Sequence, residues 1–276
     1  MALVRSELFK IQRQQSTRRL VALPVLGLLV YAAFCALSHG PTRGHALQGA
    51  LDVLDPLGFI LQLGLGAALV LVASRTVAQE YQLGTIQVLV GRGVGRVRLL
   101  LAELAALTAL AAGGLVVGAA AGCLLAVALV PGLAADLHTL PPVFWRDAEL
   151  DLVATCFSLA ACLMLGTFAA ALTRSLSVSL AMSVAWLPLE NLLVLLIGLA
   201  VAVTNLDGLR QVTGFLLSAN LNVLPQALAP WRQVPVFLAT PLVDVGPAHA
   251  VAVTLGWLAL FFGGSILLTW RRDVTH

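Results

Sequence analysis

The sequence predicts an all-α, polytopic membrane protein with six transmembrane helices, and two observations lead to this fold class. The 276-residue chain is 60% hydrophobic with a mean hydropathy of +0.98, and charged residues make up only 11% of it. A soluble domain carries about 25% charged residues. The apolar residues also gather in six runs, each long enough to cross a bilayer core of about 30 Å. Because lipid offers no partners to open backbone groups, we expect each run to be a helix.

The six predicted spans belong to a single transmembrane domain that extends over residues 1–276. They are Leu20–Leu37, Pro56–Ser74, Leu99–Val130, Leu152–Leu172, Leu176–Val203 and Ala248–Trp270. Pro188 removes one backbone hydrogen bond from the fifth span and favours a kink there. The segment before the last span, residues 204–247, is rich in proline and in apolar patches. We therefore expect a structured outer segment, made of short helices or a re-entrant hairpin.

An N-terminal interfacial helix is expected before the first span. Val4, Leu8 and Ile11 recur at the spacing of one helical face, while Arg5 and Arg13 fall elsewhere on the helix. Such a helix lies in the headgroup plane with its basic side chains toward anionic lipid. The alternative is a basic tail whose charges serve topology alone.

The distribution of cations predicts that both termini lie in the cytoplasm. Twelve of the 16 Lys and Arg residues fall on one side of the predicted spans. They lie in the N-terminal stretch, the second–third and fourth–fifth connections, and the C-terminal tail. The positive-inside rule assigns that side to the cytoplasm.

Several kinds of chemistry are excluded or unsupported by the sequence. The net charge of +3 is too small to indicate a nucleic-acid partner. Lys10 is the only lysine, and no phosphate-binding loop surrounds it, so the chain cannot hydrolyse ATP by that route. The five histidines show no ligand spacing, and the four cysteines lie in apolar runs as small hydrophobes. We therefore expect no catalytic residue, no metal site and no disulfide.

The connection between the second and third spans, residues 75–98, carries the most informative motif. It reads as a short amphipathic helix, a glycine-rich turn and the basic start of the next helix. Gly84 follows Glu80 by four residues and allows a bend, and Thr85 can cap the next turn. Arg92 and Arg96 lie among glycines that break the helix. The alternative is an ordinary connection whose arginines serve topology.

This motif resembles the same connection in ABC transporter permeases of the type-2 export class. The shared order is Glu80-x-x-x-Gly84-Thr85, then Leu89, then Arg96. The six spans, the basic N-terminal helix and the structured outer segment resemble that class over the whole chain. One departure is that the family often has a lysine at the start of the third span, where this chain has Ala102-Glu103.

The resemblance implies that the connection docks on a separate ABC ATPase subunit. Glu80, Gly84 and Thr85 would belong to the docking helix, and Arg92 and Arg96 would approach the ATPase or phosphate headgroups. ATP and Mg would be bound by that partner and no cofactor by this chain. The resemblance also implies a second permease copy or a homologous permease, membrane lipids as partners, and the plasma membrane of a prokaryote.

Glu190 and Asn191 form the clearest polar point inside a predicted span. A charged group at mid-bilayer costs about 2.5–3.5 kcal/mol on insertion scales for Asp, Lys and Arg. Glu190 is therefore expected to face the protein interior, as part of a transport path or a subunit seam. The alternative is a neutral carboxyl group bonded to a neighbouring helix.

Three glycines of the third span, Gly114, Gly118 and Gly122, lie four residues apart. Such a row of small residues allows two helices to approach closely in lipid. Packing within the chain is the simpler interpretation, and a dimer seam is the alternative.

The sequence thus predicts the transmembrane subunit of an ATP-driven exporter of an unidentified substrate. Two other classes of function stay open. One is a gradient-driven secondary carrier that uses Glu190 as a relay, although such carriers usually show broken helices in both halves. The other is a membrane scaffold that does not transport.

Overall fold

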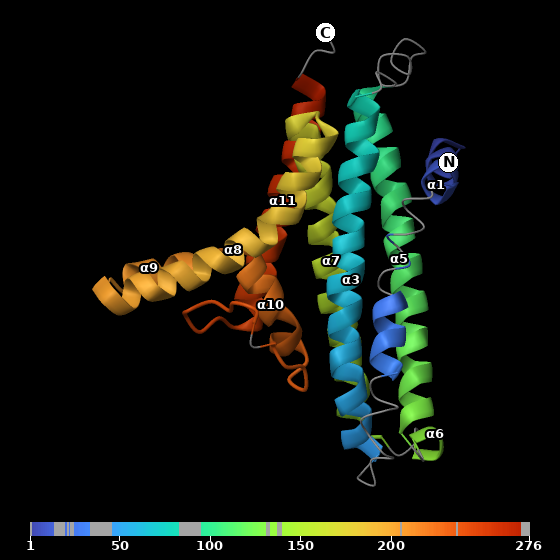
Figure 1. Ribbon diagram of the computed structural model, residues 1–276, viewed down its shortest axis with the longest axis vertical. Coiled ribbons are helices and arrows are strands. Elements are labelled where there is room, and N and C mark those ends of the chain that lie inside the picture. Colours follow the sequence, from blue (N-terminus) through green and yellow to red (C-terminus); the bar gives the residue numbers. More distant parts are fainter. Residues whose placement is uncertain are drawn as a thin grey trace.

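The described part of the chain is built of helices, without any strand, in the computed structural model (Figure 1). The structure describes residues 2–13, 20, 22, 25–33, 46–82, 95–130, 133–136, 140–204, 206–235 and 237–271. Five of the described helices are long and apolar enough to cross a membrane. This is the architecture of a polytopic membrane protein, and the predicted all-α class is confirmed.

The five long helices correspond to the second to sixth predicted spans. They are α3 (Ala46–Gln82), α5 (Arg96–Leu129), α7 (Pro142–Thr173), α8 (Leu176–Thr204) and α11 (Pro247–Arg271). The shorter helices are α1 (Ala2–Arg13), α6 (Leu133–Asp136), α9 (Gly208–Thr213) and α10 (Leu217–Leu228). Much of the first predicted span, Leu20–Leu37, lies outside the described residues; residues 25–33 are helical, and Leu28 packs against α3.

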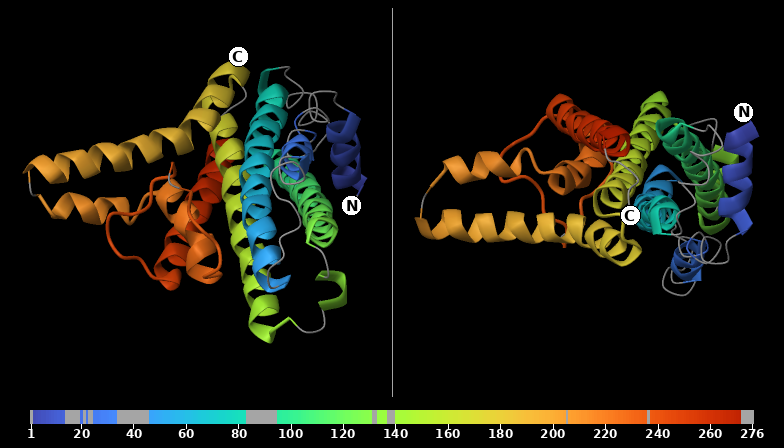
Figure 2. Two further views of the ribbon diagram at one scale, coloured as in Figure 1. Left: turned by 60° about the horizontal axis from the view of Figure 1, so that its bottom comes forward. Right: turned by 90° about the horizontal axis from the view of Figure 1, so that it is seen from above.

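Helices α3 and α7 form the centre of the bundle. More than half of the most apolar window of each is buried, 56% in α3 and 61% in α7, against 22% or less in α5, α8 and α11. The two helices approach closely because Gly166 of α7 has no side chain. A Cβ at that position would come within 2.5 Å of the backbone oxygen of Val70. Figures 1 and 2 show α5 and α11 flanking this central pair.

Three helix ends extend beyond the predicted spans by two turns or more. Residues 75–82, expected in the connection after the second span, continue α3, because Val77 and Ala78 are buried against neighbouring helices and no glycine intervenes before Gly84. At the other end, α3 begins ten residues before Pro56. Helix α7 likewise begins ten residues earlier than the predicted span, at Pro142, since proline suits the first turn of a helix.

Helix α8 leaves the bundle partway along its length. Its first half packs beside α7, and its second half turns away toward α9, as Figures 1 and 2 show. The helix continues through Pro188, where a missing backbone hydrogen bond favours such a bend. The outer segment then folds back, and α10 packs against α7, α8 and α11. Short helices in residues 204–247 are therefore present.

The N-terminal helix α1 lies beside α5 (Figure 1). Ile11 is completely buried in a core cluster with residues of α3 and α5, and Leu8 packs against the same cluster. Phe9 and Arg13 lie on the outer side, with the guanidinium carbon of Arg13 4.8 Å from the centre of the Phe9 ring. The apolar face of α1 is thus used, at Leu8 and Ile11, for packing within the chain.

Candidate functional site

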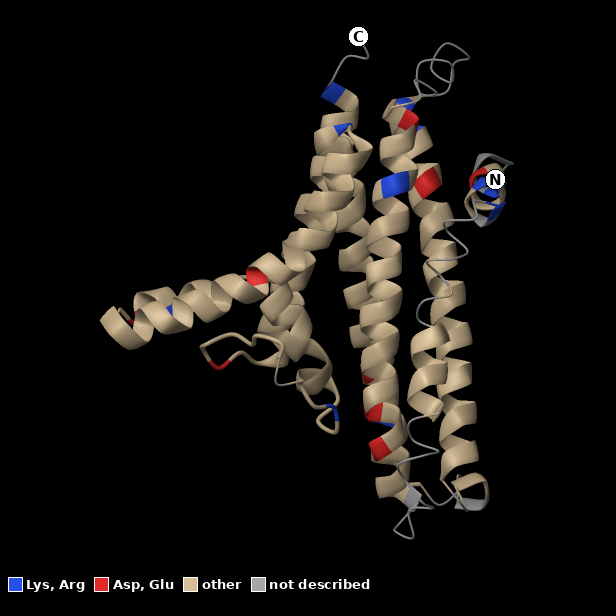
Figure 3. Ribbon diagram, in the orientation of Figure 1, with Lys and Arg blue, Asp and Glu red and all other residues tan. Residues whose placement is uncertain are grey.

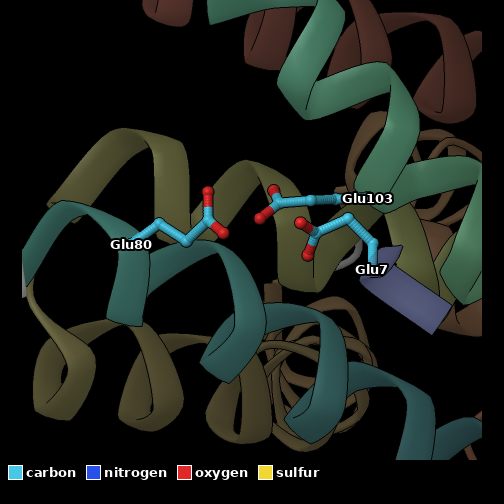
Figure 4. A group of neighbouring side chains, drawn as sticks. All are labelled: Glu7, Glu80 and Glu103. Carbon is cyan, nitrogen blue, oxygen red and sulfur yellow. The ribbon is translucent and has the colours of Figure 1, made fainter. Parts of the chain in front are cut away.

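Three buried carboxylates meet where α1, α3 and α5 come together. Glu7 of α1, Glu80 of α3 and Glu103 of α5 are each less than 10% exposed. One carboxylate oxygen of each lies within 4.8 Å of the others. Figure 4 shows the three side chains pointing toward one another. We call Glu7, Lys10, Glu80 and Glu103 the carboxylate–lysine cluster.

Lys10 supplies the positive charge of this cluster. Its Nζ lies 2.5 Å from Oε1 of Glu80 and 3.2 Å from Oε2 of Glu7. Burial lowers the pKa of Lys10, but the hydrogen bond and charge of Glu80, together with the other two carboxylates, raise it by more. The pKa therefore lies above its ordinary value of 10.5. Lys10 is charged at neutral pH and joins α1 to α3.

The carboxylate–lysine cluster has the donor type of a hard-cation site, because carboxylate oxygens are the ligands that Ca²⁺ and Mg²⁺ prefer. The ammonium of Lys10, however, already lies against two of the three carboxylates. A metal ion would have to displace it or share its partners. The geometry therefore describes an ion pair between α1 and α3, with the Glu103 carboxylate of α5 close beside it.

The same end of α3 is also joined to the far side of the bundle. The guanidinium of Arg174 lies 5.5 Å from the centre of the Tyr81 ring, and the Tyr81 hydroxyl lies 3.3 Å from that of Thr269. Arg174 ends α7 in a left-handed conformation, with φ of 53°. The last turn of α3 thus contacts α1, α5, α11 and the α7–α8 turn, directly before the connection to α5.

The predicted coupling residues fall into two groups. Gly84, Thr85 and Arg92 lie outside the described residues. Arg96 is the first residue of α5, and Glu80 is 4% exposed inside the carboxylate–lysine cluster. In this structure Glu80 therefore faces its own helices.

The sequence analysis did not predict that Glu7, Lys10 and Glu103 lie together with Glu80. One pattern contained the information, because Glu7 and Ile11 are four residues apart and must share a helical face. If Ile11 is buried, Glu7 is buried with it and needs a partner. Which residues of α3 and α5 would supply that partner depends on tertiary contacts.

Glu190 and Asn191 fasten the outer segment to α8 at its bend. Glu190 accepts hydrogen bonds from the indole N–H of Trp186 at 2.8 Å and from the backbone N–H of Ser218 at 2.6 Å. The side-chain oxygen of Asn191 accepts bonds from Asn222 at 2.9 Å and from the backbone of Ala239 at 3.0 Å. Both polar residues are thus bonded to groups of the outer segment.

The glycine row of α5 lies partly against α3. A Cβ at Gly118 would collide with the side chain of Leu61, and one at Gly114 would come within 3.0 Å of Leu65. Around Gly122 no described atom lies within 4 Å of the Cβ position. Two of the three glycines therefore allow α5 to approach α3 within the chain.

The chain matches no protein-family model, and it matches no curated protein.

Proposed function

We propose that this chain is the transmembrane subunit of an ATP-driven exporter of the ABC type-2 class. It would move an unidentified substrate with a separate ATPase chain and with a second permease, either a copy of itself or a homologue. The observation that supports this most is the carboxylate–lysine cluster. It brings α1, α3 and α5 together at Glu80, a residue of the connection whose sequence resembles the ATPase-docking segment of that class.

A contact between helices at this place suits the transmission of movement from the ATPase to the membrane helices. In the proposed mechanism the ATPase grips the connection between α3 and α5 and closes when it binds ATP and Mg. Helix α3, with 37 residues, spans about 55 Å at 1.5 Å per residue. A movement of its end would reach the opposite side of the membrane. Glu80 then acts as the anchor that makes α1 move with α3, and nucleotide shifts the population of two states by its differential affinity.

The proposed orientation places the carboxylate–lysine cluster at the cytoplasmic surface of a prokaryotic plasma membrane. Arg96 and Arg98 at the start of α5, Arg174 and Arg271 lie toward that end of their helices. Their side is the one that the positive-inside rule assigns to the cytoplasm. Helix α1 would lie at the lipid interface with Arg5, Phe9 and Arg13 outward, all of them exposed.

A second permease is supported by the apolar surface of α8. Only 17% of its most apolar window is buried within the chain. Leu192, Leu195, Leu199 and Val203 are exposed on the part that leaves the bundle. A helix that extends away from its own bundle with so much apolar surface requires cover from lipid or from another subunit.

Co-purification tests the proposal directly. The chain would be purified by an affinity tag from membranes of its host in mild detergent, and ATP hydrolysis would be measured in the eluate. We expect an ATPase subunit at a fixed ratio to this chain. Glu80→Gln should lower the recovered activity, because it removes the charge that holds Lys10. Glu149→Gln, an exposed glutamate of α7, is the matched control and should leave it unchanged.

Two results would overturn the proposal. One is the absence of ATPase activity in every eluate while the chain itself elutes as a folded, monodisperse species. The other is substrate movement in liposomes that contain this chain alone and are driven by an ion gradient. The second result would favour a secondary carrier.

A further inference from the structure

A polar pocket lies at the end of α3 opposite the carboxylate–lysine cluster. It has a volume of about 840 Å³ and is bounded by the first turns of α3 and by the segment after α10. Its polar and aromatic lining includes Asp52 and Asp55 of α3 with Gln226, Trp231, Arg232 and Gln233. Figure 3 shows acidic residues on this part of α3. Ligand pockets of proteins commonly have volumes of about 300–1,000 Å³.

The one cation that lines this pocket is already engaged. Arg232 is 2% exposed, and its guanidinium lies 3.0 Å from Asp151 and 3.3 Å from Asp55. It also donates to the backbone oxygen of Asp55. The absence of a side chain at Gly58 leaves the space that this guanidinium occupies. Arg232 therefore fixes the wall of the pocket and has its charge neutralised by two carboxylates.

The charge that remains in the pocket is negative. Two carboxylates of the lining, Asp52 and Asp55, face one cation, Arg232. Asp151 lies outside the lining and also pairs with Arg232. The carboxylate of Asp52 is exposed and accepts a hydrogen bond from the neutral amide of Gln48 at 3.1 Å. A negative cleft attracts cations and raises their local concentration.

The remaining lining suits an organic cation better than a bare metal ion. Trp231 offers an aromatic ring that already lies near one cation, since the guanidinium carbon of Arg232 is 5.8 Å from the ring centre. An ammonium ligand would use the same cation–π attraction to this ring. Gln226 and Gln233 offer amide oxygens as acceptors for N–H donors. The volume is also far greater than one metal ion requires. We infer that this pocket binds an organic ammonium ligand through Asp52 and the ring of Trp231.

This inference does not depend on the proposed ATPase partner, so its test needs only the full chain in detergent or nanodiscs. Benzyltrimethylammonium serves as the probe and is titrated calorimetrically. Benzenesulfonate is the anionic probe of similar size, and Ca²⁺ is the inorganic cation. We expect saturable binding of the ammonium probe and no binding of the sulfonate.

Two variants identify the groups that bind. Asp52→Asn should weaken the ammonium probe about fivefold, the most that an exposed ion pair contributes. Glu149→Gln is the matched control, because it removes one negative charge from an exposed residue of α7 outside the lining. Trp231→Leu should weaken binding about three- to tenfold, and Trp231→Phe should retain most of it. Circular dichroism and gel filtration verify that each variant is folded.

Three outcomes would overturn the inference. They are no saturable binding of the ammonium probe to the unmodified chain, equal weakening by Asp52→Asn and Glu149→Gln, and competition by Ca²⁺ at a site insensitive to Trp231→Leu. The first outcome would leave the proposed exporter function untouched. The absence of an ATPase partner would in turn leave this inference standing.

Discussion

Glu190 of α8 accepts the backbone N–H of Ser218 at 2.6 Å, and Ser218 is the second residue of α10. A carboxylate at this place meets both the free N–H groups and the positive end of the helix dipole. The outer segment is therefore anchored to α8 two residues after Pro188, where α8 leaves the bundle. A polar residue inside an apolar helix here acts as a fastening point for another segment.

Replacing Glu190 by Leu should loosen α10 and destabilise the protein. The change leaves the indole N–H of Trp186 and the backbone N–H of Ser218 without their acceptor. Each buried unpaired donor costs about 1–3 kcal/mol, so for these two donors we expect the free energy of unfolding to fall by about 2–6 kcal/mol. A denaturant titration in detergent micelles measures it. Leu189→Ala, at an exposed neighbouring position, should change it by less than about 1 kcal/mol; an equal loss in both variants would contradict this account.

Replacing Lys10 by Met should detach α1 from α3 and α5. The variant keeps an unbranched apolar side chain, one atom shorter, but leaves three buried carboxylates without their cation, which is strongly unfavourable. We expect faster proteolysis and faster amide hydrogen exchange in residues 2–13. The double variant Lys10→Met/Glu80→Met should recover part of the protection, because it also removes one of the charges. A double variant as exposed as the single one would show that the ion pair does not hold α1.

The attachment of α1 should be insensitive to pH over the neutral range and weaken in strong alkali. The pKa of Lys10 is raised above 10.5 in the folded chain. A raised pKa in a cationic group gives stability that is fully present below the unfolded value of 10.5 and is lost as the pH rises through the folded value. A spin label at exposed Phe9 should therefore keep its mobility from pH 7 to about pH 10 and become more mobile above it. In Lys10→Met this alkaline transition should be missing.

Replacing Gly118 by Ala should destabilise the contact between α5 and α3. The added methyl group collides with Leu61, and overpacking of this kind costs about 1–3 kcal/mol. Gly113→Ala is the matched control on the same helix, since nothing lies within 4 Å of its Cβ position. That control should be neutral or more stable by up to about 1 kcal/mol. Thermal unfolding in detergent compares the two. In a Leu61→Ala background, which is itself less stable, Gly118→Ala should cause no further loss.

Replacing Arg232 by Leu should be costly, because it leaves Asp55 and Asp151 without their cation. Loss of one partner from a buried ion pair costs about 3–5 kcal/mol. Arg210 provides the comparison, since it is about half exposed and lies 3.4 Å from the exposed Asp207. Arg210→Leu should cost about 1 kcal/mol or less. Similar losses of unfolding free energy in both variants would mean that the network around Arg232 contributes little.

The hydropathy pattern predicted the helices well and their ends unevenly. The last two spans end within one residue of α8 and α11, because turn-forming or charged residues flank their apolar runs. The predicted span leaves out the first ten residues of α3, where Asp52 and Asp55 lower the local hydropathy. Those two carboxylates lie in the helix because its first turns form part of a polar pocket with Arg232. Contacts of that kind join segments about 180 residues apart and leave no trace in local composition.

The candidate site shows the same limit. The position of Glu190 in an apolar span indicated that it needs a partner, yet Ser218 became that partner only because the outer segment folds back. Glu80 was singled out by its motif, whereas its contact with Lys10 joins residues 70 apart. The sequence therefore pointed to individual residues that need partners, and the fold supplied the partners.

The bond between Trp186 and Glu190 has a consequence for biogenesis. It joins residues one turn apart in the same helix, at 2.8 Å, so it can form as soon as α8 coils. The nascent segment can then enter the bilayer with its acidic group already partly shielded, before α10 has been synthesised. The backbone N–H of Ser218 would complete that shielding once α10 has been synthesised. The carboxylate of Glu190 would thus gain its two hydrogen bonds in the order in which the segments are translated.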